Sequence, residues 1–123
     1  MTTDPFFLPV SGMEMPRFAG VATFMRLPHM PADHPRRPEV KIGLVGLPFD
    51  GGTSNRPGPR HAPRALRDAS TMIRAQHPVT GMRPFETVAC ADIGDIGPNP
   101  VDVLDTLARF ERAFAALKAA GIR

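Results

Sequence analysis

The sequence lacks several features that define large classes of proteins. It has a single cysteine, Cys90, no tryptophan and no tyrosine. One cysteine cannot form an internal disulfide framework, and this suits a reducing cytoplasm. No apolar run approaches the ~18 residues of a membrane-spanning helix. The first residues show neither the basic nor the apolar region of a secretory signal. The sequence therefore predicts a cytoplasmic protein without disulfides or a membrane span.

Proline and glycine are abundant, with 15 and 11 residues in a chain of 123. This share exceeds that of an average chain but stays below that of unpatterned disorder. It argues against a wholly disordered chain and equally against a compact helical bundle. The length allows one domain at most, with a modest core.

Residues 1–39 hold seven of the 15 prolines and show little periodicity. Each proline removes a backbone donor and moves the preceding residue out of the helical region, so we expect an extended arm. The arm needs a surface to cover its apolar side chains, which are Phe6, Phe7, Leu8, Phe18, Val21, Phe24, Met25 and Leu27. We therefore divide the chain into a proline-rich arm, residues 1–39, and an α/β region, residues 40–123.

The α/β region alternates strand and helix patterns. Residues 40–47 and 87–91 are short apolar runs typical of strands buried on both faces of a parallel sheet. Between them a helix is predicted from Pro63, with its apolar face formed by Leu66, Ala69 and Ile73.

A second helix is predicted after Asn99, which we expect to be its N-cap, with Pro100 at the first helical position. Its apolar face is predicted at helical spacing, at Val103, Leu107, Phe110, Phe114 and Leu117. Asp105 and Arg109 are spaced as an i,i+4 ion pair, and Gly121 is the expected C′ residue.

Strand–helix–strand–helix is the opening of a parallel α/β fold. Two parallel strands cannot bury both faces of a sheet, and a third strand is expected where residue 123 is reached. We therefore expect either pairing with another chain or the N-terminal part of a longer domain.

Several residue sets are candidates for chemistry. The loop at residues 46–53 has the glycine spacing of a phosphate-binding loop, but Gly52 stands where the lysine is needed, which argues against a nucleotide. The four histidines share no helical face, and zinc needs three or four convergent ligands. Asp92 and Asp95 follow the second expected strand and form an acid pair that suits proton transfer or cation binding. We favour the plainer alternative, a turn in which both carboxylates accept backbone N–H groups.

Six arginines and one acidic residue lie within residues 56–83. Such a patch suits phosphates. No lysine or aromatic residue accompanies these arginines, which favours a solvated helix face and loop arginines that contact carbonyls or carboxylates.

Four segments resemble one enzyme family. Residues 17–28 are similar to the N-terminal arm of agmatinase-type ureohydrolases, and residues 46–60 (GLPFDGGTSNRPGPR) resemble the loop after their first strand. Residues 63–70 resemble the start of their first helix, and residues 92–95 resemble the stretch after their second strand. One departure is Ala62, where the family usually has glycine.

The resemblance implies the N-terminal part of an arginase-like three-layer α/β/α fold with a parallel sheet, often hexameric. It also implies a binuclear manganese centre, with a bridging hydroxide that attacks a guanidinium carbon to release urea and an amine. The implied substrate is a guanidino small molecule such as agmatine or 4-guanidinobutyrate. The family's metal ligands lie in Gly-Gly-Asp-His, Asp-Ala-His-x-Asp and Asp-x-Asp motifs, none of which occurs in these 123 residues.

The resemblance therefore assigns no catalytic or metal residue to this chain, and we expect neither catalysis nor bound manganese from the chain alone. It does assign a loop of the substrate-pocket wall, formed by Asp50, Thr53, Ser54, Asn55, Arg56, Pro57 and Gly58. Residues 17–28 are expected at contacts within a homo-oligomer. The alternative is a non-catalytic product that docks on a full-length homologue through its sheet edge and apolar arm. A weaker third hypothesis is nucleic-acid binding through the arginines.

Overall fold

The centre of the fold is a pair of parallel strands. The computed structural model describes residues 3–123, with β1 at Ile42–Gly46 and β2 at Cys90–Asp95. Ile42 lies opposite Cys90 and Gly46 opposite Asp95. Between these two pairs β2 has one more residue than β1, and Gly94, with a φ of +85°, lies in this irregular stretch. The predicted parallel pairing is confirmed.

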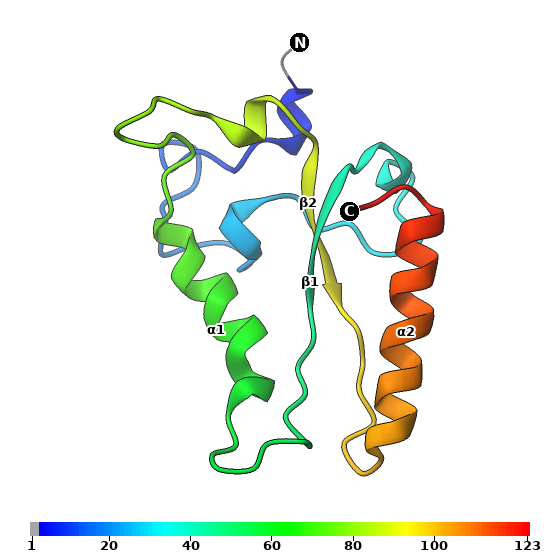
Figure 1. Cartoon of the computed structure of the whole chain (residues 1–123). Helices are drawn as coiled ribbons and strands as arrows, with labels where there is room; N and C mark the ends of the chain where they lie inside the picture. The colour runs from blue at the N-terminus through cyan, green and yellow to red at the C-terminus, as the bar shows by residue number, and fades with distance from the viewer. Residues whose placement is uncertain (1–2) are drawn as a thin grey trace.

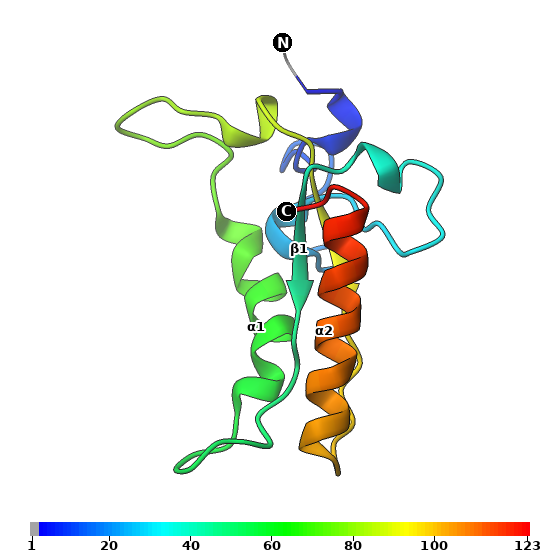
Figure 2. The same cartoon turned by 45° about the vertical axis from the view of Figure 1, so that its right-hand side comes forward.

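One helix covers each face of the sheet. Figure 1 shows α1 (Ala62–Ala69) and α2 (Val103–Ala119) on opposite sides of the strands. Figure 2 shows both helices beside β1, with the connection from α1 to β2 projecting away from the sheet. Two glycines of β1 point to opposite faces of the sheet. A Cβ on Gly43 would meet Ile122, which follows α2, and a Cβ on Gly46 would meet Pro63 of α1. The chain thus builds three layers around two strands.

The core is small and divided by the sheet. On the α2 face, the buried side chains are Phe7, Met30, Val40, Ala91, Ile93 and Ile122. On the α1 face, they are Leu27, Phe85 and Cys90. The arm therefore contributes to both clusters, and Cys90 is the small buried side chain that its place in an apolar strand predicts.

The buried face of α1 differs from the predicted one. Leu66 and Ile73 are exposed at 57% and 51%, whereas Pro63 and Ser70 are buried. The side chain of Arg67 is only 11% exposed. The apolar periodicity gave the wrong face because polar partners on β2 and the arm hold Arg67 and Ser70. The α-helix also ends at Ala69, and a 3₁₀ turn, Ser70–Met72, follows.

The start of α2 lies three residues later than predicted. Its N-cap is Asp102, whose carboxylate accepts the amide N–H of Asp105 at 3.0 Å. Asn99 instead holds the preceding turn, because its side chain accepts from the amide of Val101 and its amide group donates to Asp105. The C′ prediction is confirmed, since Gly121 has a φ of +75°.

The predicted apolar stripe of α2 faces the sheet only in part. Val103, Leu107 and Phe114 are 42–53% exposed, whereas Thr106 is fully buried. The hydroxyl of Thr106 donates to the carbonyl of Asn99 at 2.8 Å and accepts its amide at 2.9 Å, so this polar side chain is satisfied inside the fold. The predicted ion pair between Asp105 and Arg109 is present at 2.8 Å.

Residues 3–39 contain short 3₁₀ turns at Pro5–Phe7, Phe24–Arg26 and Arg37–Glu39. Phe7 and Leu27 are buried as expected, but Phe18 and Val21 are 94% and 92% exposed. No helix among the described residues is long and apolar enough to cross a membrane.

Candidate functional site

Two loops meet at the carboxyl edge of the sheet, the end where open α/β sheets bind ligands. β1 ends at Gly46 and β2 ends at Asp95, its register partner, so residues 47–61 and 96–102 follow at the same end (Figure 1). The strands approach closely here because Gly46 has no side chain. A Cβ at this position would overlap the carboxylate of Asp95 and would lie 2.8 Å from the Cβ of Pro63.

Asp50 organises the loop that follows β1. Its buried carboxylate accepts the amide N–H of Gly58 at 2.7 Å and the Nε–H of Arg60 at 2.6 Å. Its carbonyl accepts the hydroxyl of Thr53 at 2.9 Å. The hydrogen bond from Arg60 and the amide of Gly58 hold the pKa of Asp50 well below its usual range. Asp50 is therefore a permanently charged internal brace for this loop at neutral pH.

The structure brings together only part of the predicted pocket loop. Asp50, Thr53 and Gly58 are joined by these hydrogen bonds, and Gly58 has a φ of +144° that favours glycine. The remaining predicted residues are exposed on the outer turn of the loop: Ser54, Asn55, Arg56 and Pro57. The outer turn of the loop therefore exposes a hydroxyl, an amide and a guanidinium group to solvent beside the carboxyl edge of the sheet.

A second polar cluster joins α1 to β2. The guanidinium of Arg67 donates to both oxygens of Asp92, at 2.7 and 3.0 Å, and to Asp95 at 2.7 Å. Asp92 is 1% exposed and lies within β2, not after it as the sequence suggested. Strand pairing continues through Asp92 because an arginine neutralises its carboxylate.

The charge state of this cluster is also fixed. Burial alone raises the pKa of Asp92, but hydrogen bonds from Arg67 and the amides of Phe24 and Gly94 outweigh burial and lower it. The pKa of Arg67 is raised, first by its hydrogen bond to Asp92. The expected turn with two backbone-bonded carboxylates is therefore only partly present, since Asp92 accepts amides and Asp95 binds arginine.

The arm is fastened to this cluster by an unusual turn. Met25 and Arg26 have positive φ angles, 53° and 59°, which L-residues adopt rarely. The amide of Phe24 donates to Asp92 at 3.0 Å and the amide of Met25 donates to the Ser70 hydroxyl at 2.7 Å. The ring of Phe24 lies under the guanidinium of Arg67, 4.2 Å from its Cζ. These contacts offset the backbone strain of the turn.

Sequence reasoning missed the roles of Arg67 and Phe24, whose partners are 25 and 68 residues away. The available signal was the polar pair Arg67 and Ser70, which lie three residues apart and therefore on one face of the helix. Arg67 and Ser70 lie on the same side of the helix as Pro63, the side that faces the sheet, and two polar residues there indicate a polar contact with the sheet.

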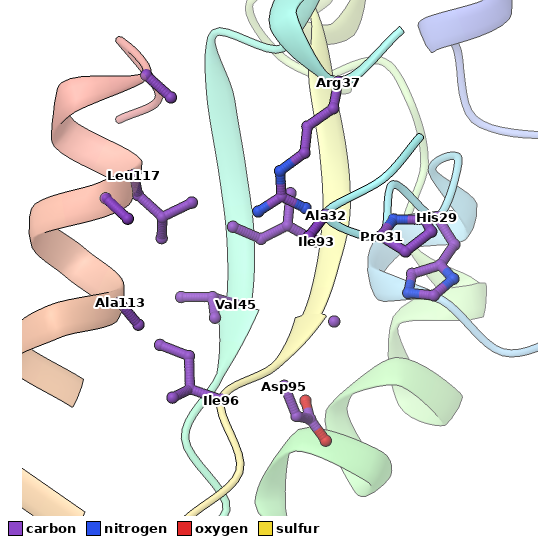
Figure 3. A pocket seen from close by; sticks show the side chains of 13 residues that line it. His29, Pro31, Ala32, Arg37, Val45, Ile93, Asp95, Ile96, Ala113 and Leu117 are labelled. Atoms are coloured by element: carbon purple, nitrogen blue, oxygen red, sulfur yellow. The ribbon is translucent and has the colours of Figure 1, made fainter. Parts of the chain in front are cut away.

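A groove of about 580 Å³ lies between the sheet and α2. Figure 3 shows Leu117 of α2 across from Val45 and Ile93 of the strands, with Arg37 above them, His29 on the right and Asp95 below. Its lining is mainly aliphatic and contains no predicted pocket-loop residue. The groove suits an apolar chain and brings no nucleophile and base together.

The carboxylates do not form a metal centre. Within residues 3–123 no three histidine, cysteine, aspartate or glutamate side chains are grouped so that they could hold a metal ion. Asp50 and Asp92, the two buried carboxylates, are each bound by an arginine. The residues present therefore do not fit the manganese centre that the sequence resemblance implies.

The six arginines of residues 56–83 include three that bind carboxylates within the fold. Arg60 pairs with Asp50, Arg67 with Asp92, and Arg83 with Glu86. These ion pairs favour the interpretation that the arginines contact carboxylates of the fold over the alternative that they form a nucleic-acid-binding surface.

Comparison with known proteins identifies the family. The Arginase family profile matches residues 40–123. Guanidinopropionase of Pseudomonas aeruginosa is 44% identical over 115 residues, which is 92% of this chain and 34% of that protein. Guanidinobutyrase of the same organism is 41% identical over 116 residues, 93% of this chain and 35% of that protein.

Solved structures agree with the sequence comparison. Proclavaminate amidino hydrolase from Streptomyces clavuligerus superposes with a TM-score of 0.76 at 36% identity, over 85% of this chain and 33% of that one. A hypothetical agmatinase from Burkholderia thailandensis gives a TM-score of 0.75 at 28% identity, over 87% of this chain and 33% of that one. The chain spans about a third of the length of the relatives it matches. Its parallel strands, flanking helices and sequence place this chain in the arginase family.

Proposed function

We propose that this chain is the N-terminal part of an enzyme that hydrolyses a guanidino compound to urea and an amine. In this reaction water adds to the guanidinium carbon, a C–N bond breaks and the amine leaves with a proton. The names of its relatives, guanidinopropionase and guanidinobutyrase, support the substrate class. Agmatine and 4-guanidinobutyrate are the substrates we propose first. The free, buried Cys90 suits a cytoplasmic enzyme.

The observation that carries the proposal is the braced loop at the carboxyl edge of the sheet. Asp50 holds this loop through Gly58 and Arg60, and the exposed side chains of Asn55 and Arg56 lie on its outer turn. We propose that this turn forms part of the pocket wall and influences which guanidino compound binds. Arg56 suits the carboxylate of a guanidino acid.

We further propose that the chain has no activity by itself, because its buried carboxylates are occupied by arginines. The metal ligands and the groups that transfer protons would then lie in other parts of the enzyme. The direct test is urea release by the purified 123-residue chain from agmatine, 4-guanidinobutyrate and 3-guanidinopropionate with added Mn²⁺. Clear turnover would contradict this proposal.

The reaction itself is tested with a chimaera. The part of this chain that matches the Pseudomonas guanidinobutyrase replaces the corresponding segment of that enzyme, and urea release is measured with the same three substrates. We expect activity, and we expect Arg56→Ala to raise KM for the guanidino acids. The matched control is Arg64→Ala, an exposed arginine on α1. A stable, metal-loaded chimaera without urea release would overturn the assignment, and equal KM values for both variants would remove the role of the loop.

A second candidate function is non-catalytic docking on a full-length homologue or assembly with further copies. It is favoured by three arm side chains that are almost fully exposed, Met13, Phe18 and Val21, at 97%, 94% and 92%. Co-purification with the Pseudomonas guanidinobutyrase and size-exclusion chromatography test it. A soluble monomer that captures no homologue would exclude this function.

A further inference from the structure

Arg26 is a buried arginine without a counter-ion. The residue is 9% exposed, and its terminal nitrogen Nη1 has no hydrogen-bond partner among the described residues, while Nη2 donates to the carbonyl of Met15. The ion pairs within residues 3–123 use other arginines, namely Arg36, Arg60, Arg67, Arg83 and Arg109. A guanidinium keeps its charge in a protein, and a buried charge with an unused donor destabilises the fold. Arg26 therefore lacks a negatively charged partner.

A cavity of about 380 Å³ adjoins this guanidinium. Arg26 lines it together with Thr23 and Leu27, which flank the left-handed turn, and with the aliphatic side chains of Val10 and Val21. The hydroxyl of Thr23 already donates to the carbonyl of Leu27 at 2.7 Å. The cavity therefore suits a small molecule with a short apolar chain and a group that accepts hydrogen bonds from the guanidinium.

Arg17 adds a second positive charge beside Nη1. A Cβ on Gly12 would lie 4.0 Å from Nη1 of Arg26 and 3.7 Å from Nε of Arg17, so both guanidinium groups lie near Gly12. Nη1 of Arg17 donates to the carbonyls of Thr71 and Ile73, at 2.7 and 3.1 Å. These acceptors are neutral, so they hold the side chain in place without compensating its charge. Two positive charges thus favour an anion at this place.

The segment that covers Nη1 is itself exposed. Residues 10–22 are exposed throughout. Their backbone hydrogen bonds include those of short turns, such as the bond from the amide of Met15 to the carbonyl of Ser11 at 3.0 Å. A segment with few buried contacts opens at low free-energy cost. A ligand in the cavity can therefore reach Nη1 after a local shift of this segment.

We propose that Arg26, with Arg17 beside it, forms a binding site on the arm for a small aliphatic monocarboxylate. The carboxylate accepts hydrogen bonds from Nη1 of Arg26, and the apolar chain of the ligand lies against Val10 and Val21. Glu14 lines the same cavity, so a second negative charge on the ligand is unfavourable, and phosphate fits less well than a monocarboxylate. The proposal does not depend on the reaction proposed above.

Butyrate is the probe for this site. Its binding to the 123-residue chain is followed by NMR on the side-chain N–H signals of Arg26, at constant ionic strength. We expect a saturable shift with a Kd on the order of 1 mM, binding of phosphate about tenfold weaker, and no shift with the uncharged butyramide. Arg26→Gln should abolish the binding of butyrate, whereas Arg64→Gln, at an exposed arginine of α1, should leave it unchanged. A shift that does not saturate, or an equal response to butyramide, would overturn the proposal.

A carboxylate built into the chain gives a second measurement that needs no ligand. Gly12 accepts a side chain, because its Cβ would make contacts of 3.7–4.0 Å and its φ is outside the left-handed region. Gly12→Asp places a carboxylate beside Nη1 of Arg26, and Gly12→Asn is the matched control of the same shape. We expect Gly12→Asp to have the higher urea midpoint of unfolding and to block the binding of butyrate. Equal midpoints with butyrate binding intact in both variants would contradict the proposed site.

Two other carboxylates compete for this place, that of Glu14 and that of a second copy of the chain. We expect Glu14→Gln to strengthen the binding of butyrate, because it removes a negative charge from the cavity, and to leave the urea midpoint unchanged. A lower midpoint would identify Glu14 as the partner of Arg26 and overturn the proposal. A change of the Arg26 signals with protein concentration, without butyrate, would overturn it in favour of a second copy.

Discussion

The two edges of the sheet are finished in different ways. The outer side of β2 is bridged by the backbone around His29, and the Asp92 carboxylate is bound by Arg67 of α1 and by the amide of Phe24 in the arm. The outer side of β1 is bonded to Arg123, which exchanges backbone hydrogen bonds with Lys41 and Gly43. The β2 edge is thus held by contacts with a distant segment of the chain, the arm, whereas the described part of the β1 edge is held by the last residue of the sequence.

The largest expected effect comes from breaking the closed edge. Asp92→Ala leaves Arg67 buried without its main partner and removes the acceptor for the arm, which costs about 3–5 kcal/mol. Urea unfolding measures the loss, and trypsin cleavage in the arm should become faster. Asp33→Ala is the control, an exposed arm carboxylate expected to change stability by less than about 0.5 kcal/mol. Equal stability of both variants would show that the cluster does not hold the edge.

Protonation of Asp92 is expected to reduce the stability of the fold by less than the Asp92→Ala substitution does. The pKa of Asp92 is lowered in the folded state, so its contribution is fully present above the ordinary aspartate pKa, about 4. It is lost as the pH falls from there through the folded-state value, and the lowered pKa of Asp50 acts in the same direction. Thermal unfolding should show a Tm that falls below about pH 4. The fall should be shallower in Asp92→Asn, and an identical slope would contradict this account.

Where the two strands meet, Gly46→Ala tests their close approach. The added Cβ overlaps the Asp95 carboxylate and lies 2.8 Å from Pro63, so we expect a loss of about 1–3 kcal/mol. Urea unfolding measures this loss. Gly52→Ala is the matched control, because nothing lies within 4 Å of its Cβ. A Gly46→Ala variant with unchanged stability would show that the two strands do not approach closely at this position.

The smallest effect compares one methyl group on each strand. Ile93→Val, in the buried part of β2, should cost about 0.5–1.5 kcal/mol. Ile42→Val, at the open edge of β1, should cost less because that side chain is 40% exposed. Chemical unfolding of both variants measures the difference, and an equal or reversed order would place Ile42 in a buried contact, as pairing of this edge in solution would do.

The sequence predicted the elements better than it predicted their contacts. Two strands, two helices and parallel pairing follow from local periodicity, and so does Gly121 at the end of α2. The prediction of the buried face of α1 was wrong because Arg67 and Ser70 are buried by partners outside the helix. No local pattern contains that information.

The candidate site shows the same division. The family resemblance assigned Asp50 to a loop of the pocket wall, and that role stays a prediction. Its buried position follows from bonds to Gly58 and Arg60 that spacing does not reveal. Asp92 was expected beyond a strand because a carboxylate normally ends one, and its arginine partner removes that restriction. The late start of α2 has a similar cause, since Asn99 holds the preceding turn and Asp102 becomes the cap.

The left-handed turn of the arm has a consequence for the order of folding. Its Phe24 amide binds Asp92, 68 residues further along the chain. A ribosome therefore releases the arm long before its binding site exists, and Leu27 and Met30 stay exposed to water until β2 has been made. Contacts between distant segments form slowly, because a long loop must close before any of them stabilises the fold. Binding of the arm to Asp92 is thus a late step of folding, because it requires that the first β–α–β unit has already formed.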